Sequence, residues 1–267
     1  MPSKRLLTTV VCIALAACGS TNNNTSGATS SSPSGQATEL TVFAASSLTA
    51  AFTQIGSDFE AANPGTAVTF NFGSSGDLAA SIQSEGTADV FASASGTYMD
   101  DVSTKVGVSG RADFAQNKLV VITPKNNPAG ISSLKDLAKP GIQVVLAAAG
   151  VPVGDYARQV LQTAAIQKAV LANVVSNEVD DASVVVKITS GEADAAIVYL
   201  SDVTSAVASQ VKAIQIPDSV NVIATYPIAV VTATSHADTA QAFVDYVTGS
   251  QGQATLADFG FLPPPPT

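Results

Sequence analysis

The chain has 267 residues, a formal net charge of −9, and 46% hydrophobic against 12% charged side chains. This length suits one large domain or two small ones, and the acidic balance argues against a nucleic-acid partner. Two cysteines and one histidine, His236, are too few for a zinc site, and no serine–histidine triad is expected.

The first 38 residues are expected to lie outside the fold. Residues 1–17 have a positive start at Lys4 and Arg5 and an apolar run to Ala17, which is typical of a secretory signal peptide. Leu15-Ala-Ala-Cys18 resembles a bacterial lipobox, which predicts a lipid on Cys18, followed over 18–38 by a Ser/Thr/Asn/Gly-rich tether. The alternative is an ordinary signal peptide with an incidental cysteine. The sequence thus predicts an extracytoplasmic lipoprotein anchored to the cell membrane, with no disulfide and a mature charge of −11 once Lys4 and Arg5 are removed.

From Leu40 onward, short β-prone runs alternate with helical periodicity, which predicts an α/β protein with mainly parallel sheets flanked by helices. The expected strands are 40–44, 67–72, 90–92, 118–123, 143–147, 173–176, 195–198, 211–215 and 225–231. The expected helices are 48–62, 77–85, 97–106, 133–138, 153–164, 167–171, 182–190, 201–207 and 239–248. No segment after the signal is apolar enough to span a membrane.

The chain order further predicts two hinged lobes. The apolar runs 117–124 and 224–230 could carry the chain from one lobe to the other. We therefore expect lobe 1 to comprise 39–120 and 225–267, with lobe 2 inserted as 121–224.

Two serine-containing turns in lobe 1 indicate an anion site. Ser46 and Ser47 stand between the first strand and its helix, and Ser75 lies in the turn 73–76 before the next helix. The first N–H groups of a helix have no partner inside it and carry the positive end of the helix dipole, so these turns favour a small oxyanion.

Lobe 2 offers three more candidate donors. Pro152 begins a helix after a buried strand and leaves the Val153 amide free, and the amide of Asp181 is free in the same way at the start of a later helix. Tyr199 ends the apolar run 195–198, so its hydroxyl would emerge at a sheet edge. Taken singly, each of these features more often has a structural role than a binding role. The first two commonly mark the start of a helix, and a tyrosine in this position commonly closes a hydrophobic core.

Catalytic patterns are weak in this sequence. No GxxxxGK[ST] loop occurs, and His236 is expected in an exposed loop. The acidic pairs Asp100-Asp101 and Asp180-Asp181 are expected to be solvated faces or helix caps. The protein is therefore predicted not to be an enzyme, the alternative being an extracytoplasmic enzyme that uses Asp180 or Asp181 as a base.

Taken together, six segments resemble the molybdate-binding proteins of ABC importers, and the resemblance covers about residues 40–261. They are Phe43-Ala-Ala-Ser-Ser-Leu-Thr, Phe72-Gly-Ser-Ser-Gly, Ala88-Asp-Val-Phe-Ala-Ser-Ala, Val151-Pro-Val-Gly-Asp-Tyr-Ala, Gly191-Glu-Ala-Asp-Ala-Ala-Ile-Val-Tyr and Tyr226-Pro-Ile-Ala-Val-Val.

The resemblance implies a hinged, two-lobe periplasmic-binding-protein-like (type II) fold that closes on a tetrahedral oxyanion, molybdate or tungstate, and delivers it to an ABC permease. The family's ligand donors fall on five positions of this chain: Ser47, Ser75, Val153, Asp181 and Tyr199. Molybdenum would be held as its oxyanion without direct ligation by side chains, no cofactor is implied, and a monomer is expected.

Two acidic residues depart from the family pattern, Asp77 after the second serine turn and Asp181 itself. A carboxylate facing a dianion would be repelled, so both side chains are expected to point away from the ligand or to cap their own helices. If either carboxylate faced the ligand, a protonated oxyanion such as hydrogen phosphate would be the more plausible ligand, because its O–H needs an acceptor. A sulfate or phosphate receptor of the same fold is therefore the alternative.

Overall fold

The computed structural model describes residues 38–266. The predicted signal peptide, Cys18 and residues 19–37 of the predicted tether lie outside the described residues. Of the helices in 38–266, none combines the length and the apolar character needed to cross a membrane.

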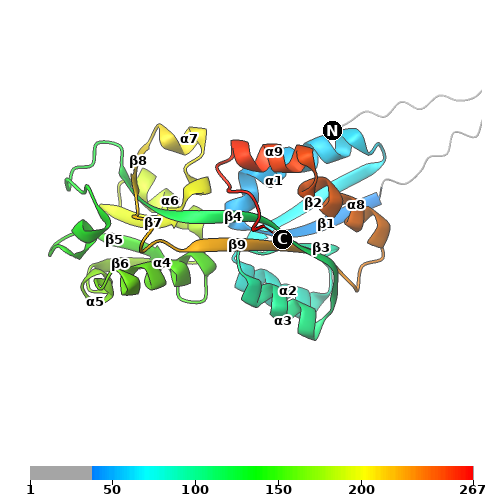
Figure 1. The fold of residues 1–267 in the computed structure, drawn as a ribbon, viewed down its shortest axis with the longest axis horizontal. Coiled ribbons are helices and arrows are strands. Elements are labelled where there is room, and N and C mark those ends of the chain that lie inside the picture. Colours follow the sequence, from blue (N-terminus) through cyan, green and yellow to red (C-terminus); the bar gives the residue numbers. More distant parts are fainter. Residues whose placement is uncertain (1–37, 267) are drawn as a thin grey trace, which may run out of the picture. The chain divides into compact units, whose positions relative to one another are not determined.

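The first group of strands carries the amino-terminal part of the fold (Figure 1). Strand β1 (Thr38–Ala45) pairs in parallel with β2 (Thr66–Gly73) and with β3 (Val90–Ala92), and β9 (Ile223–Val231) adds antiparallel to β3. The single turn η1 (Ser46–Leu48) leads into α1 (Thr49–Ala62), and the other helices of this group are α2 (Ser75–Glu85), α3 (Gly96–Lys105), α8 (Ala237–Thr248) and α9 (Ser250–Asp258).

Aromatic side chains hold the outer helices of this group together. Phe59 of α1 packs edge-to-face on Phe243 and Tyr246 of α8, with ring centroids 5.3 and 5.6 Å apart. Phe52 lies between Phe114 and Phe243 at 5.8 and 6.1 Å. These rings are fully or largely buried, so the packing of α1, at the start of the fold, depends on α8, near its end.

The second group of strands follows the same plan. Strand β5 (Val144–Ala147) pairs in parallel with β6 (Val174–Glu178) and β7 (Ala195–Tyr199), and β8 (Val211–Gln215) pairs antiparallel with β4 (Val108–Pro124). Around them lie η2 (Leu134–Ala138), α4 (Pro152–Thr163), α5 (Gln167–Leu171), α6 (Asp181–Thr189), η3 (Leu200–Asp202) and α7 (Ser205–Ala208). β5 and β7 are buried along their whole length, as the apolar runs predicted.

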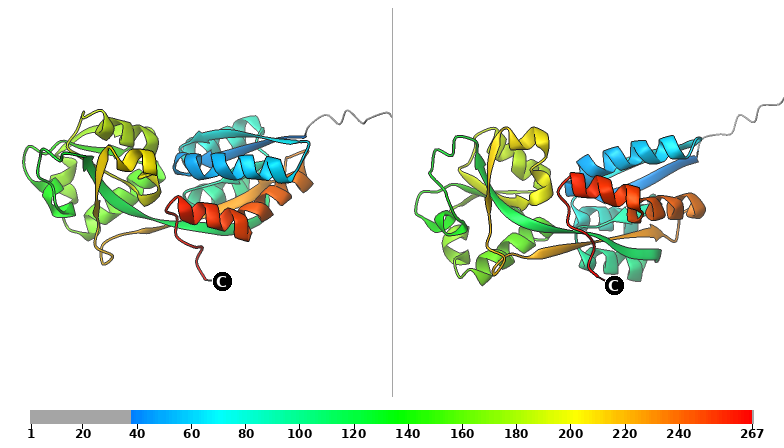
Figure 2. Two further views of the ribbon diagram at one scale, coloured as in Figure 1. Left: turned by 90° about the horizontal axis from the view of Figure 1, so that it is seen from above. Right: turned by 45° about the horizontal axis from the view of Figure 1, so that its top comes forward.

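Strand β4 belongs to both groups and joins them. Residues 108–118 pair with β9, and residues 119–124 pair with β7 and β8, so the sheet order is β2-β1-β3-β9-β4-β7-β5-β6 with β8 beside β4. Figures 1 and 2 show β4 and β9 running side by side between the two groups. The α/β, two-lobe fold class is thus confirmed, with the antiparallel pairs supplied by β4, β8 and β9. The exact lobe boundaries stay a prediction, because β4 has partners in both lobes.

Four element predictions were wrong or incomplete. β4 begins at Val108 rather than at 118, and α9 was not predicted at all. The expected helix 133–138 is the 3₁₀ turn η2, and 201–207 is divided between η3 and α7. The first half of β4 alternates poorly because its register against β9 shifts between Ser109 and Ala112 and again between Asp113 and Ala115.

Candidate functional site

One small pocket between the two groups of strands gathers all five predicted site residues: Ser47, Ser75, Val153, Asp181 and Tyr199. Its other lining residues are Ala45, Ser46, Gly73, Ser74, Ala94, Val151 and Pro152. The elements η1 and α2 contribute from the first group, and α4, α6 and β7 from the second. Residues more than 150 positions apart in the sequence therefore meet at one pocket. Anion binding by these residues stays a prediction.

The two serines are buried at the ends of parallel strands. Ser47 follows β1, is 8% exposed, and its Oγ lies 3.0 Å from the Tyr226 hydroxyl oxygen. Ser75 opens α2, is 1% exposed, and its Oγ accepts the Ala94 N–H at 3.0 Å. Because that oxygen already accepts, the hydroxyl hydrogen of Ser75 is available as a donor.

Val153 lies in the first turn of α4, just after Pro152. Helix geometry leaves its N–H without an intrahelical acceptor, while the Asp155 N–H bonds to the Val151 carbonyl at 2.9 Å and begins the ladder. The following Gly154 has a packing role, because a Cβ there would lie 2.3 Å from the Ala148 carbonyl oxygen. Glycine thus lets the first turn of α4 sit directly against the end of β5.

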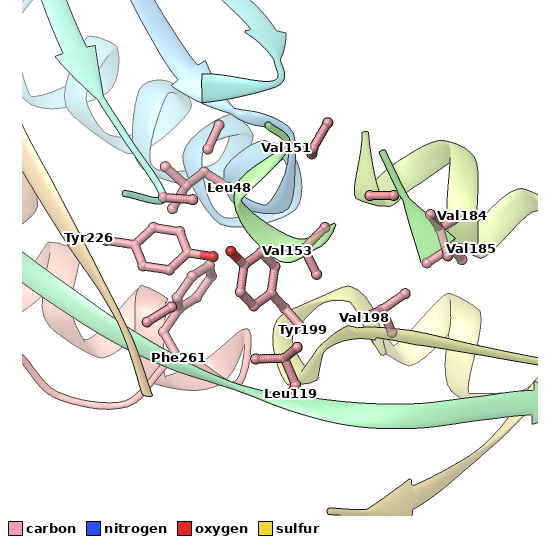
Figure 3. Packing of buried hydrophobic residues seen from close by; sticks show 14 of the residues in the cluster. Leu48, Leu119, Val151, Val153, Val184, Val185, Val198, Tyr199, Tyr226 and Phe261 are labelled. Carbon is pink, nitrogen blue, oxygen red and sulfur yellow. The ribbon is translucent and has the colours of Figure 1, made fainter. Parts of the chain in front are cut away.

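Tyr199 presents a hydroxyl that nothing in the described protein satisfies. The residue is 1% exposed, and its Oη has no hydrogen-bond partner among residues 38–266. Figure 3 shows it pointing toward the hydroxyl of Tyr226, which is itself shared with Ser47 and Asn117. Burial raises the pKa of both phenols well above the ordinary value, so each is a neutral group able to donate.

The expectation for the Asp181 side chain was wrong. Asp180, not Asp181, caps α6 by accepting the Ser183 N–H at 2.7 Å. The Asp181 side chain lines the pocket, is 3% exposed, and accepts a hydrogen bond from the Ser46 hydroxyl through Oδ1. Its Oδ2 is buried and receives no N–H or O–H from the described protein. The pattern failed because both acidic residues suit the first turn of a helix, and only one of them can be its cap.

A second carboxyl lies behind Asp181. Asp202 of η3 accepts the Tyr199 N–H through Oδ2 at 2.8 Å, and the negative charge of Asp181 acts on its carboxyl. Burial raises the pKa of the Asp181 carboxyl, and burial followed by the charge of Asp181 raises the pKa of Asp202 well above its ordinary value. The sequence carried no signal for this pairing, because Asp202 follows Tyr199 in what reads as an ordinary turn.

Asp77 behaves as predicted, since it is exposed in the first turn of α2 and does not line the pocket. The other acidic candidates have structural partners: Asp100 pairs with Arg111, and Asp180 caps α6. His236 immediately precedes α8, and its Nδ1 lies 3.4 Å from an Asp89 oxygen. None of these side chains lies beside a nucleophile in the pocket.

The positive potential of the pocket comes from backbone N–H groups and not from cationic side chains. Its lining residues include no lysine, arginine or histidine within the described range. The amino-terminal turns of η1, α2, α4 and α6 reach it instead, bringing unpaired N–H groups and the positive ends of helix dipoles. Such a set suits a ligand that offers only acceptors, and the two serine hydroxyls and the Tyr199 phenol add donors of the same kind.

The comparisons with known proteins define the class. Residues 40–262 match the family of bacterial extracellular solute-binding proteins, and the chain belongs to that family.

The individual proteins to which the chain is similar include molybdate-binding proteins and a sulfate-binding protein. The chain is 38% identical over 263 residues to the molybdate-binding protein ModA of Mycobacterium tuberculosis, covering 98% of each chain. Among solved structures, it is similar to the periplasmic molybdate-binding protein of Azotobacter vinelandii, with 23% identity, a TM-score of 0.76, and 85% and 100% of the two chains covered. It is also similar to the sulfate-binding protein SubI of Mycobacterium tuberculosis, with 18% identity, a TM-score of 0.74, and 85% and 87% covered. The fold alone therefore does not distinguish the two anions.

Proposed function

We propose that this protein is an extracytoplasmic receptor that captures molybdate, or its close analogue tungstate, and delivers it to an ABC permease. The observation that supports this most directly is the meeting of Ser47, Ser75, Val153, Asp181 and Tyr199 around one pocket. The similarity to a molybdate-binding protein over 98% of both chains supports the same ligand.

The proposed roles follow from the donor types. Ser47 and Ser75 give hydroxyl and amide hydrogens, Val153 and Asp181 give amides, and Tyr199 gives its phenol. About seven charge-assisted hydrogen bonds at roughly 1.5–3 kcal/mol each supply about 10–20 kcal/mol. Association and lobe closure oppose this by about 4–15 kcal/mol, so binding requires most of these donors to be engaged at once.

Calorimetry of the mature domain against molybdate, tungstate, sulfate and phosphate tests the proposal. Replacing Ser47 or Ser75 by alanine is expected to weaken molybdate binding by at least about 1 kcal/mol, because each change removes a donor from a desolvated site. Ser84→Ala is the matched control, since Ser84 lies on α2 like Ser75 but is exposed and bonds only to carbonyls of its own helix. Unchanged affinity in both site variants would place the ligand elsewhere.

A phosphate receptor is the second candidate, and one observation favours it. The Asp181 side chain faces the pocket, and an ionised carboxylate there would accept the O–H of hydrogen phosphate while repelling a fully deprotonated dianion. Tighter binding of phosphate than of molybdate in the same titrations would select it. Sulfate lacks that O–H at neutral pH, so it gains nothing from such a carboxylate.

The cellular arrangement is part of the proposal. A lipid on Cys18 would hold the receptor at the outer face of the cell membrane, with residues 19–38 as a tether, and the folded part would act as a monomer without enzymatic activity. Cys18→Ala should release the protein into the medium, and sedimentation of the mature domain should give the mass of one chain. Retention of the Cys18→Ala protein at the membrane would contradict the anchor.

A further inference from the structure

The proposed function does not use the side chain of Asp181, which lines the pocket, or that of Asp202 behind it. Asp181 stands at the amino-terminal end of α6 and contacts Ser46 of η1 from across the pocket. Asp202 stands in η3 directly after β7 and holds the backbone N–H of Tyr199. One oxygen of Asp181 is buried without a protein donor, in a pocket where Tyr199 has an equally unpartnered hydroxyl.

The groups that face this pair offer no positive charge to balance it. α6 adds the carboxylate of Asp180, β7 the phenol of Tyr199, β9 the phenol of Tyr226, and η1 only the neutral Ser46. No lysine or arginine among the described residues is a cause of the shift of either carboxyl's pKa.

Two carboxylates in this setting cannot both stay ionised at low cost. Burial raises the pKa of both carboxyls, and the negative charge of Asp181 raises the pKa of Asp202 further. A dianion bound beside them would add two further negative charges and favour the protonated form still more. A protonated carboxyl is then a donor, which is the only kind of group that a fully deprotonated oxyanion can use.

We propose that the Asp181 side chain takes up a proton from solvent when the dianion binds and donates it, from Oδ2, in a hydrogen bond to an oxygen of that dianion. This rests on the proposed function and adds Asp181 as a specificity-determining side chain beyond its backbone amide. The proton turns an acidic residue that would exclude molybdate into one that selects it over hydrogen phosphate.

The linkage has a definite sign. Ligand binding raises the pKa of the pair above its value in the free protein, so the complex is favoured below the free-state pKa. Its affinity falls as the pH rises from the free-state pKa to that of the complex, by up to about tenfold per pH unit for one proton. Above the pKa of the complex, the affinity reaches its lower limit and no longer changes with pH.

The test is calorimetric titration with molybdate from about pH 6 to about pH 9, which lies above the ordinary carboxyl pKa of about 4. At each pH it is run in two buffers of different ionisation enthalpy, so that the difference in heat counts the protons taken up. The wild-type protein is expected to take up a measurable fraction of a proton, up to one, and to bind less tightly as the pH rises. Asp181→Asn keeps a donor without a titrating proton, so its uptake should fall to near zero and its affinity should change little with pH. Asp77→Asn is the matched control, because Asp77 is exposed in the first turn of another helix, α2, and does not line the pocket, and it should behave as the wild type does.

Two results would overturn the inference. One is molybdate binding by the wild type with no proton uptake and no pH dependence anywhere in the range, a result that does not depend on any variant folding. The other is equal uptake by the wild type and Asp181→Asn. Failure of the proposed function looks different, since then the wild-type protein would not bind molybdate at any pH.

Discussion

At the scale of single residues, the buried hydroxyl of Tyr199 supports the proposal that the pocket binds a ligand. An unsatisfied buried hydroxyl costs about 1–3 kcal/mol of stability. The described protein leaves this one without a partner although Tyr226, Ser47 and Asn117 satisfy one another close by. A partner supplied by the ligand would explain the arrangement.

Tyr199→Phe should therefore separate binding from stability. Losing the phenol removes a donor, so molybdate affinity should fall by at least about 1 kcal/mol, or roughly fivefold or more, while the free energy of unfolding stays equal or rises slightly. Calorimetry and thermal unfolding measure the two effects. Tyr226→Phe is the contrasting control, because it breaks the contacts to Ser47 and Asn117 and should lower stability. Full affinity in Tyr199→Phe would remove Tyr199 from the donor set.

The sequence predicted which residues meet at one pocket but not the orientation of the Asp181 side chain, and the binding roles of these residues stay a prediction. The strand-to-helix turns place Ser47, Ser75, Val153 and Asp181 at helix starts, and the structure brings all four together with Tyr199. Which way the Asp181 side chain turns depends on Asp180 taking the cap and on Asp202 and Ser46 meeting it from distant segments. Local pattern carries no information about such partners.

At the scale of elements, the start of α4 shows how closely the backbone is packed around the pocket. Gly154 lies where a Cβ would press on the carbonyl oxygens of Ala148 and Ala147, at 2.3 and 2.5 Å. Arg158 closes the same turn by donating to the carbonyls of Ala147 and Gly154 at 2.8 Å. The turn that carries the Val153 amide is therefore held against the end of β5 by the close packing of Gly154 and by the Arg158 side chain.

Gly154→Ala should displace this turn. Relief of the clash needs a backbone shift that costs about 1–3 kcal/mol of stability, and moving the Val153 amide should weaken molybdate binding as well. Gly96→Ala is the matched control, since Gly96 also opens a helix but a Cβ there would meet only Arg111 Nη2 at 3.8 Å. Thermal unfolding and calorimetry of both variants measure the effects, and equal behaviour of the two would refute the packing argument.

Most elements were predictable because their apolar periodicity is strong, and the failures have identifiable causes. Helix α9 contains Gly249 as its cap and Gly252 inside it, which weakens any local helix signal. Gly252 instead allows close packing, as a Cβ there would lie 2.5 Å from the carbonyl oxygens of Tyr246 and Val247 in α8. The early part of β4 is similarly explained by its two register shifts against β9.

At the scale of the whole molecule, charge and ligand oppose each other. The chain carries a formal net charge of −9, and a molybdate dianion must approach it before reaching the uncharged donors of the pocket. Repulsion acts over about 30 Å at 0.01 M salt and about 8 Å at 0.15 M salt. The short-range hydrogen bonds of the pocket are screened much less.

The association rate of molybdate should therefore rise as salt is added. We expect it to increase several-fold between about 10 mM and about 150 mM sodium chloride, while the dissociation rate changes little. The sequence contains no tryptophan and five tyrosines, so stopped-flow tyrosine fluorescence is the natural measurement. An association rate that falls with salt would mean that a local positive field, and not the net charge, governs the approach.

The packing of Phe59 in α1 on Phe243 and Tyr246 in α8 also affects how the chain matures. Synthesis proceeds from the amino terminus, so α1 and β1 are made long before the helix that covers them and before β9, which completes their sheet. The intervening strands β5 to β8, by contrast, are made as one continuous stretch and can assemble while the ribosome is still working. The earliest residues of the fold are thus expected to be among the last to reach their native contacts.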